Sequence, residues 1–188
     1  MCTIARVVAL SKNKTADFEA VFLPHLDAAY NLARWLTRDP TDADDVVQEA
    51  YFRAFKFFEG FHGGDSRAWL LTIVRNTCYT WLQQNRSREF ATGLDDDSYT
   101  AESDTPDPEA ALLKNVDNEM VRRAIDELPV EFREAIVLRE LEEMSYKQIA
   151  DISGVPLGTV MSRLARGRKR LQQVLTRAES KEHEHEVQ

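Results

Sequence analysis

An acidic segment in the middle of the chain limits what this sequence can fold into. Residues 91–111, ATGLDDDSYTAESDTPDPEAA, contain seven acidic residues, two prolines and no basic residue. A segment with so few apolar side chains cannot form a core, so it indicates a flexible linker. The 188-residue chain is 43% hydrophobic, which is enough for one or two small cores on the two sides of this segment. We therefore expect two compact units joined by an acidic flexible linker.

Apolar residues recur at helical spacing on both sides of the linker, and no alternating strand pattern competes with them. The fold class is therefore predicted to be all-α, with small helical domains at 17–90 and 112–178. We expect disordered segments at 1–16 and 179–188. The predicted helices span about 17–37, 41–58, 67–88, 109–128, 129–141, 145–153 and 157–178, with Thr41 as a candidate N-cap.

The segment from Tyr146 to Arg170, YKQIADISGVPLGTVMSRLARGRKR, has the spacing of a helix-turn-helix. Gly154 can supply the positive φ that a sharp turn needs, and Pro156 can begin a helix but cannot extend the preceding one. The second helix has an apolar stripe for burial, formed by Val160, Leu164, Gly167, Leu171 and Val174. The C-terminal domain is therefore predicted to contain a DNA-binding helix-turn-helix.

The other face of this second helix is polar and basic. No acidic residue occurs from Gly158 to Arg177, although the whole chain has a net charge of −8. Solvated helix faces usually mix both signs of charge, whereas this surface suits phosphates and base edges. Because the chain as a whole is acidic, DNA binding must be local or assisted by a partner. The candidate DNA-binding residues on this face are Thr159, Ser162, Arg163, Arg166 and Arg170.

Two surfaces of the N-terminal domain are candidate binding sites. On the helix predicted at 41–58, the side chains expected to face outward are those of Asp45, Gln48, Glu49 and Phe52. Carboxylates beside an aromatic ring suit a basic protein partner better than DNA. Taken alone, however, these acids fit an ordinary solvated helix start better than a binding site.

The loop GFHGGDSRAW and the helix after it carry basic, amide and aromatic groups, which suit single-stranded nucleic acid. Gly63 and Gly64 permit an irregular loop path. The loop residues His62, Asp65 and Ser66 offer hydrogen bonds to a flipped base. The candidate helix residues are Arg75, Asn76 and Tyr79, whereas Trp69 is expected to be a core anchor.

Several classes of function find no support in the sequence. Cys2 and Cys78 have no metal-binding spacing, and His183 and His185 at the chain end fit solvated residues better than metal ligands. We therefore expect no metal, no cofactor and a reducing compartment. The acids of the linker are not a preorganised catalytic site, so no enzymatic activity is expected. No apolar run is long enough for a signal peptide or membrane span, which predicts a cytoplasmic protein without membrane insertion.

Three blocks, in this order, resemble an extracytoplasmic-function (ECF) sigma factor of bacterial RNA polymerase. They read DADDVVQEAYFRAF, SRAWLLTIVRNTCYTWLQQNR and LPVEFREAIVLRELEEMSYKQIADISGVPLGTVMSRLARGRKRL, and the resemblance runs from about Phe18 to Leu175. It implies a factor that binds core polymerase, melts the minus-ten region of a promoter and reads its minus-thirty-five element. The competing classes are a stand-alone helix-turn-helix regulator, which binds duplex DNA unaided, and an enzyme that acts on nucleic acid.

The resemblance also implies residue roles. Asp45, Gln48 and Glu49, with Phe52 beside them, would contact the clamp helices of the largest polymerase subunit. The loop from Phe61 to Ser66, with Arg75, Asn76 and Tyr79, would capture an unpaired minus-ten base. Arg139 and Tyr146 would support Ser162, Arg163 and Arg166 at the minus-thirty-five element.

Further partners follow from the same resemblance: the flap of the second-largest polymerase subunit and a cognate anti-sigma factor. The acidic linker would thread into the active-centre cleft of the polymerase, although a plain tether explains its composition equally well. One departure from the family concerns Met161, which stands where many relatives carry a basic side chain.

Overall fold

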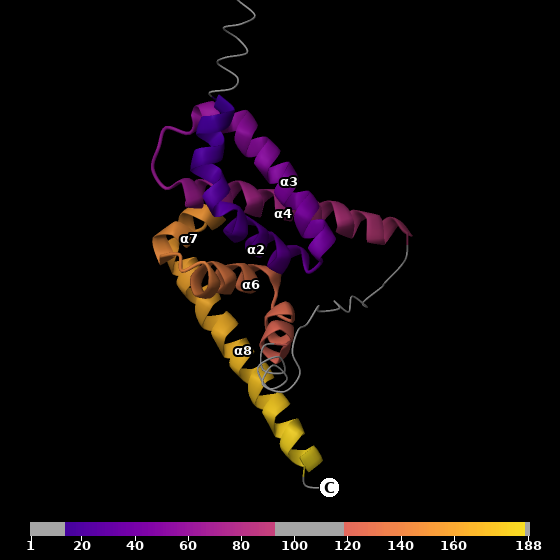
Figure 1. The fold of residues 1–188 in the computed structure, drawn as a ribbon. Coiled ribbons are helices and arrows are strands. Elements are labelled where there is room, and N and C mark those ends of the chain that lie inside the picture. The colour runs from indigo at the N-terminus through magenta and orange to yellow at the C-terminus, as the bar shows by residue number, and fades with distance from the viewer. Residues whose placement is uncertain (1–13, 93–118, 187–188) are drawn as a thin grey trace, which may run out of the picture. The chain divides into compact units, whose positions relative to one another are not determined.

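The computed structural model describes residues 14–92 and 119–186, with side chains over 14–86 and 119–177. All regular structure in these two ranges is helical, which confirms the predicted all-α class (Figure 1). The chain separates into two compact units, one on each side of the acidic segment. Residues 93–111 of the predicted linker, the first 13 residues and the side chains of His183 and His185 lie outside this description.

The first unit is built from three main helices that pack on one another: α2 (Leu26–Thr37), α3 (Pro40–Phe57) and α4 (Ser66–Thr92). Helix 14–22 and the short 3-10 helices η1 (Leu23–His25) and η2 (Phe58–Gly60) complete it. Its fully buried side chains belong to all three main helices and helix 14–22, and they include Phe22, Leu32, Leu36, Ala50, Leu70 and Val74. The core therefore sits where these helices meet.

Two details at helix starts differ from the prediction. The helix predicted at 17–37 is interrupted by η1, because Pro24 has no N–H to donate and disfavours helical geometry in the residue before it. Helix α3 is capped by Asp39, and Thr41 lies inside the helix. The Asp39 side chain accepts a hydrogen bond from the Asp42 main-chain N–H at 3.0 Å. Pro40 then occupies the first helical position, where its fixed φ and missing N–H are tolerated.

The second unit contains helix 119–126, α6 (Val130–Ile136), the π-helical turn η3 (Val137–Leu141), α7 (Tyr146–Ser153) and α8 (Leu157–Glu186). Helices α6 and α8 pack closely at Gly167, where an added Cβ would lie 3.0 Å from Ile136 Cγ1. The backbone of α8 is helical over 179–186, where we expected a disordered tail, because this stretch holds good helix formers and neither glycine nor proline.

The helix-turn-helix prediction is confirmed in its local chemistry. Ser145 and Gln148 form a reciprocal capping box at the start of α7. Gly154 ends α7 with φ 65°, a left-handed conformation that disfavours residues with a Cβ. Helix α8 begins directly after Pro156, and Val160, Leu164 and Gly167 are buried as predicted, whereas Leu171 and Val174 are only half-buried.

Candidate nucleic-acid and protein interfaces

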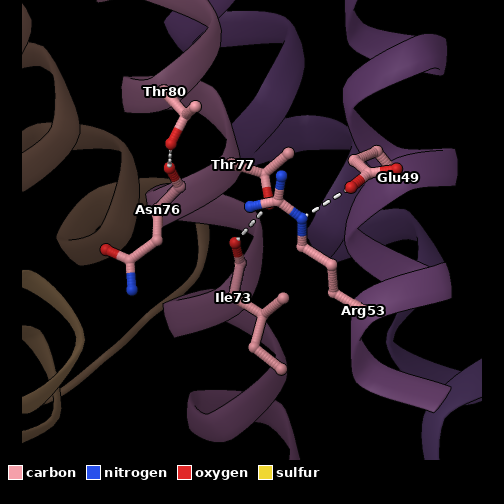
Figure 2. A network of polar contacts seen from close by, with 6 residues as sticks. All are labelled: Glu49, Arg53, Ile73, Asn76, Thr77 and Thr80. Carbon is pink, nitrogen blue, oxygen red and sulfur yellow. Dashed lines mark hydrogen bonds and ion pairs between the residues drawn. The ribbon is translucent and has the colours of Figure 1, made fainter. Parts of the chain in front are cut away.

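The outward face of α3 carries the predicted acidic patch, defined here as Asp45, Gln48, Glu49 and Phe52. All four side chains are exposed, Phe52 to 66% of its surface, because the helix turns Val46, Val47, Ala50 and Ala54 into the core. Sequence reasoning missed one neighbour of this patch. Arg53 Nε lies 2.6 Å from Glu49 Oε1 across one turn of the helix (Figure 2). The patch therefore combines carboxylates, an amide and an exposed ring with one partly neutralised acid.

Burial and acidic neighbours affect a carboxyl at the start of α3. Desolvation raises the pKa of Asp42, and the carboxylates of Asp39 and Asp45 raise it further. Asp45, which belongs to the acidic patch, is exposed, so its negative charge lies at the surface near the start of the helix. The electrostatic character of this face is thus negative before any partner binds.

On α4, threonine hydroxyls bond back to the helix. Thr77 Oγ1 donates to the Ile73 carbonyl at 2.9 Å, and Thr80 Oγ1 donates to the Asn76 carbonyl at 2.9 Å (Figure 2). Figure 2 shows the amide of Asn76 pointing away from Glu49 and Arg53 on α3. Asn76 and Thr80 are thus exposed on this helix, whereas Thr77 is buried.

Three predicted base-contacting residues lie together on the surface of α4. The Arg75 guanidinium lies over the Tyr79 ring, 4.1 Å from its centroid. Arg75 Nη1 also donates to Asn76 Oδ1 at 3.1 Å. A cation stacked on a phenol ring, beside an amide, offers one backbone contact and one stacking face to an unpaired nucleotide.

The loop before α4 is held by aromatic packing. The Phe61 ring lies 5.4 Å from that of Phe22 and 5.3 Å from that of Trp69, and Phe22 contacts Trp69 at 5.1 Å. Trp69 therefore packs on both rings, although it is half-buried and not part of the buried core as expected. Phe61 is half-buried in the same cluster, so it shapes the loop and offers only part of its ring to a ligand.

Asp65 and Ser66 are engaged in local hydrogen bonds. The Ala68 main-chain N–H donates to Asp65 Oδ1 at 2.9 Å, so Asp65 caps the start of α4. Ser66 Oγ lies 2.9 Å from His25 Nε2, across 41 residues of sequence. In contrast, His62 is exposed between this cap and the aromatic cluster. Next to it, Gly63 and Gly64 have φ values of 90° and 97°.

His25 is a residue whose role sequence reasoning missed. No local pattern in the sequence links position 25 to position 66. In the structure it is half-buried at the end of η1, and burial, followed by the charge of Arg67, lowers its pKa. The Asp65 carboxylate acts in the opposite direction. His25 therefore joins η1 to the start of α4 through Ser66, and its burial favours the neutral ring.

In the second unit, α8 presents the predicted basic face, but its arginines differ in their surroundings. Ser162, Arg166 and Arg170 are exposed, Thr159 is half-buried, and Arg170 lies over the Phe132 ring at 5.3 Å. The Arg163 side chain is only 20% exposed, and its Nη1 lies 3.9 Å from Oε2 of Glu134, which is fully buried. Arg163 is therefore directed toward α6 rather than outward.

Arg139 and Tyr146 stabilise the turn that precedes the helix-turn-helix. Arg139 Nη1 donates to the Met144 carbonyl at 2.8 Å, and its guanidinium lies 5.2 Å from the centroid of the Tyr146 ring. A second ion pair joins Arg168 Nη2 to Glu140 Oε1 at 2.7 Å. This hydrogen bond, with a smaller contribution from Tyr146, raises the pKa of Arg168. Sequence reasoning had assigned no role to Arg168.

Comparison with known proteins shows which family this chain resembles. Residues 21–88 match Sigma-70 region 2, and residues 118–171 match Sigma-70, region 4. The ECF RNA polymerase sigma-E factor of Haemophilus influenzae is 35% identical over 150 residues, which cover 75% of this chain and 77% of that protein. The Escherichia coli K12 sigma-E factor is 36% identical over 135 residues, 68% of this chain and 71% of its own.

The chain belongs to the ECF sigma factor family, whose members direct RNA polymerase to promoters. The ECF sigma factor SigE of Mycolicibacterium smegmatis is 34% identical over 83% of this chain, which spans 60% of that longer relative.

Solved structures agree with this assignment. The sigma factor RpoE of Bartonella quintana, crystallised with the anti-sigma factor NepR, has a TM-score of 0.72 and 30% identity, covering 85% of this chain and 97% of that one. CnrH, solved with the cytosolic domain of CnrY, has a TM-score of 0.61 at 24% identity, covers 86% of this chain and 89% of that one, and shares the fold.

Within the described ranges, no group of three or more His, Cys, Asp or Glu side chains is placed to hold a metal ion. None of the helices in the same ranges is both long and apolar enough to cross a membrane. The one described cysteine, Cys78, is buried in the core of the first unit.

Proposed function

We propose that this chain is an alternative sigma factor whose first unit binds core RNA polymerase and melted minus-ten DNA, while its second unit reads the minus-thirty-five element. The observation that carries this proposal is the presence of two exposed faces of opposite chemistry on separate units. The acidic patch on α3 suits a basic protein surface, and the acid-free face of α8 suits phosphates. A factor that joins a protein machine to DNA needs both.

The acidic patch on α3 is the proposed docking site for the clamp helices of the largest polymerase subunit. Phe52 supplies a large exposed ring beside Asp45, Gln48 and Glu49. Aromatic side chains surrounded by polar groups are typical anchors of protein interfaces. Basic residues on the polymerase would pair with the two carboxylates and compete with Arg53 for Glu49.

The proposed minus-ten site comprises the loop at 61–66 and the Arg75, Asn76 and Tyr79 cluster of α4. His62 and the Arg75–Tyr79 stack are placed to contact an unpaired base directly. Phe61, Asp65 and Ser66 would act mainly by fixing the loop, since each is already engaged within the unit.

The proposed minus-thirty-five site is the exposed face of α8. Ser162 and Arg166 would reach base edges, and Arg170 would contact phosphate. Thr159 would support them, and Arg139 and Tyr146 would position α7. The flap of the second-largest polymerase subunit is the proposed protein contact of this unit.

Two further partners follow from the proposal. A cognate anti-sigma factor would cover the polymerase-binding and DNA-binding faces, which is supported by the RpoE relative solved with NepR. All catalysis would belong to the polymerase, and this chain would supply promoter choice and melting without chemistry of its own.

Gel filtration with bacterial core RNA polymerase tests the docking site. The chain should co-elute with core polymerase, and replacing Asp45, Gln48 and Glu49 by Ala should abolish co-elution. A matched control replaces Asp17 and Glu19 by Ala. It also removes two negative charges, but from exposed positions on helix 14–22. The control variant should still co-elute.

Two results would contradict the proposal. Folded chain that never co-elutes with core polymerase but binds duplex DNA by itself would identify a stand-alone regulator. Equal loss of co-elution in the triple variant and in the control would show that general acidity, and not the acidic patch, governs binding.

A further inference from the structure

Helix α8 exposes an apolar row that the basic face does not explain. Leu157 and Met161 are 46% and 48% exposed, and Ala165 is exposed one turn further on. Residues four apart lie next to each other on one side of a helix. The buried stripe of the same helix is a different set, formed by Val160, Leu164 and Gly167. The apolar row, defined as Leu157, Met161 and Ala165, is therefore outside the core of this unit.

The surroundings of the apolar row are polar and positively charged. The neighbouring row along the helix contains Gly158, Ser162 and Arg166, and Lys169 continues the apolar row itself. No acidic residue occurs between Gly158 and Arg177. The partner of this face must therefore offer negative charge around a small apolar group.

Duplex DNA has this combination in its major groove. Phosphates line the groove, and among the base edges thymine alone presents an apolar group, the C5 methyl. Methionine suits such a contact because its flexible, polarisable side chain adapts to irregular apolar shapes. A protein partner fits less well, because three side chains cover far less than the roughly 800 Å² per partner of a stable interface.

We propose that Met161, with Leu157 beside it, packs on the C5 methyl of one thymine in the upstream promoter element. Met161 is thereby a specificity-determining residue that selects a T·A pair at one position. This inference rests on the proposed function, because it requires α8 to enter the major groove.

The test compares thymine with deoxyuridine, which lacks only the methyl group. Full chain with core polymerase first selects its upstream element from a randomised duplex pool. Each thymine of that element is then replaced singly by deoxyuridine, and binding is measured at one fixed salt concentration. One position should lose about fourfold in affinity, the value of burying one methyl group.

Variants assign that loss to a side chain. In Met161→Ala, thymine and deoxyuridine at the sensitive position should bind equally, while Met161→Leu should keep most of the difference. Val121→Ala is the matched control, since Val121 is a similarly exposed apolar residue on helix 119–126. This control should show the full fourfold effect.

Each other outcome overturns the inference in a distinguishable way. A flat deoxyuridine scan, or a sensitive position that persists in Met161→Ala, removes Met161 as the methyl reader while leaving the sigma function intact. Weaker co-elution of Met161→Ala with core polymerase, without change in the deoxyuridine scan, identifies the apolar row as a protein contact. Failure of the polymerase complex to select any element overturns the proposed function together with this inference.

Discussion

The two exposed helix faces, on α3 and α8, hold their charges in different ways. On α3 the ion pair Glu49–Arg53 joins residues of one helix, four apart in sequence. On α8, Arg163 and Arg168 pair with Glu134 and Glu140, which belong to α6 and η3. In the sequence both faces look like simple charged surfaces. On α8, however, tertiary contacts pair Arg163 and Arg168 with acids and place Arg170 over the Phe132 ring. Arg166 is left on the exposed side.

The largest expected effect distinguishes a buried acid from an exposed one. Glu134→Ala should lower the free energy of unfolding of the second unit by about 3 kcal/mol, because it leaves Arg163 without its buried carboxylate. Glu140→Ala should lower it by less than about 1 kcal/mol, because both partners of that pair are half-exposed. Native-state hydrogen exchange of α6 and α8 amides measures both. All three tryptophans, Trp35, Trp69 and Trp81, lie in the first unit, so fluorescence would not report this change.

Equal destabilisation by the two substitutions would show that burial does not separate the ion pairs of α8. A conservative variant sharpens the same comparison. Glu134→Gln keeps the shape of the side chain and removes its charge, so it should fall between wild type and Glu134→Ala.

The next effect separates DNA affinity from stability on α8. Arg166→Ala should weaken promoter-specific binding by about 1–3 kcal/mol if its guanidinium reads a base, with hydrogen exchange unchanged, because Arg166 is exposed. Arg163→Ala should instead lower the stability of the unit, because its guanidinium faces Glu134. Footprinting and hydrogen exchange on the same two variants test whether Arg166 acts on DNA affinity and Arg163 on stability. Unchanged footprints with Arg166→Ala would exclude α8 as the recognition helix.

Local signals predicted much of the second unit. Gly154 and Pro156 specify the turn by backbone conformation, and the spacing of Val160 and Leu164 specifies the buried side of α8. These signals act within a few residues, so they can be read without the fold. The choice of Asp39 over Thr41 as the N-cap of α3 is also local, because it depends on Pro40, a residue that favours the first helical position.

Pairings across long stretches of sequence could not be predicted. His25 and Ser66 are 41 residues apart, and Arg168 and Glu140 are 28 apart. Their side chains meet only because helices pack in a particular register, which hydrophobic spacing alone does not specify. The candidate site was therefore predicted as a set of surface residues, while the division into exposed and engaged members required the structure. The outward orientation of Asp45, Gln48, Glu49 and Phe52 needed only the helical period.

A smaller effect is expected for the local ion pair on α3. Arg53→Gln should change the stability of the first unit by only about 0.3–0.5 kcal/mol, as is usual for exposed pairs four residues apart. It should, however, accelerate association with core polymerase at low salt, because Glu49 loses its competing cation. Stopped-flow association rates at two salt concentrations check this. A slower rate at low salt would indicate that Arg53 itself contacts the polymerase.

The smallest effect concerns pH and the loop before α4. The pKa of His25 lies below its usual 6.5, chiefly through burial and then through Arg67, with Asp65 opposing. The folded state therefore binds a proton at this site less readily than the unfolded state. Its stabilising contribution is complete above pH 6.5 and is lost as pH falls through the lower pKa of the folded state.

Thermal unfolding monitored by tryptophan fluorescence tests the pH dependence that His25 contributes, since Trp69 packs on Phe61 of the loop before α4. Between pH 7.5 and pH 5, wild type should lose more stability than His25→Gln, which cannot be protonated and can still hydrogen-bond Ser66. Ser66→Ala should keep the pH dependence, because burial persists when the hydroxyl is removed. Parallel pH profiles for wild type and His25→Gln would show that the neutral state of His25 does not matter for the loop.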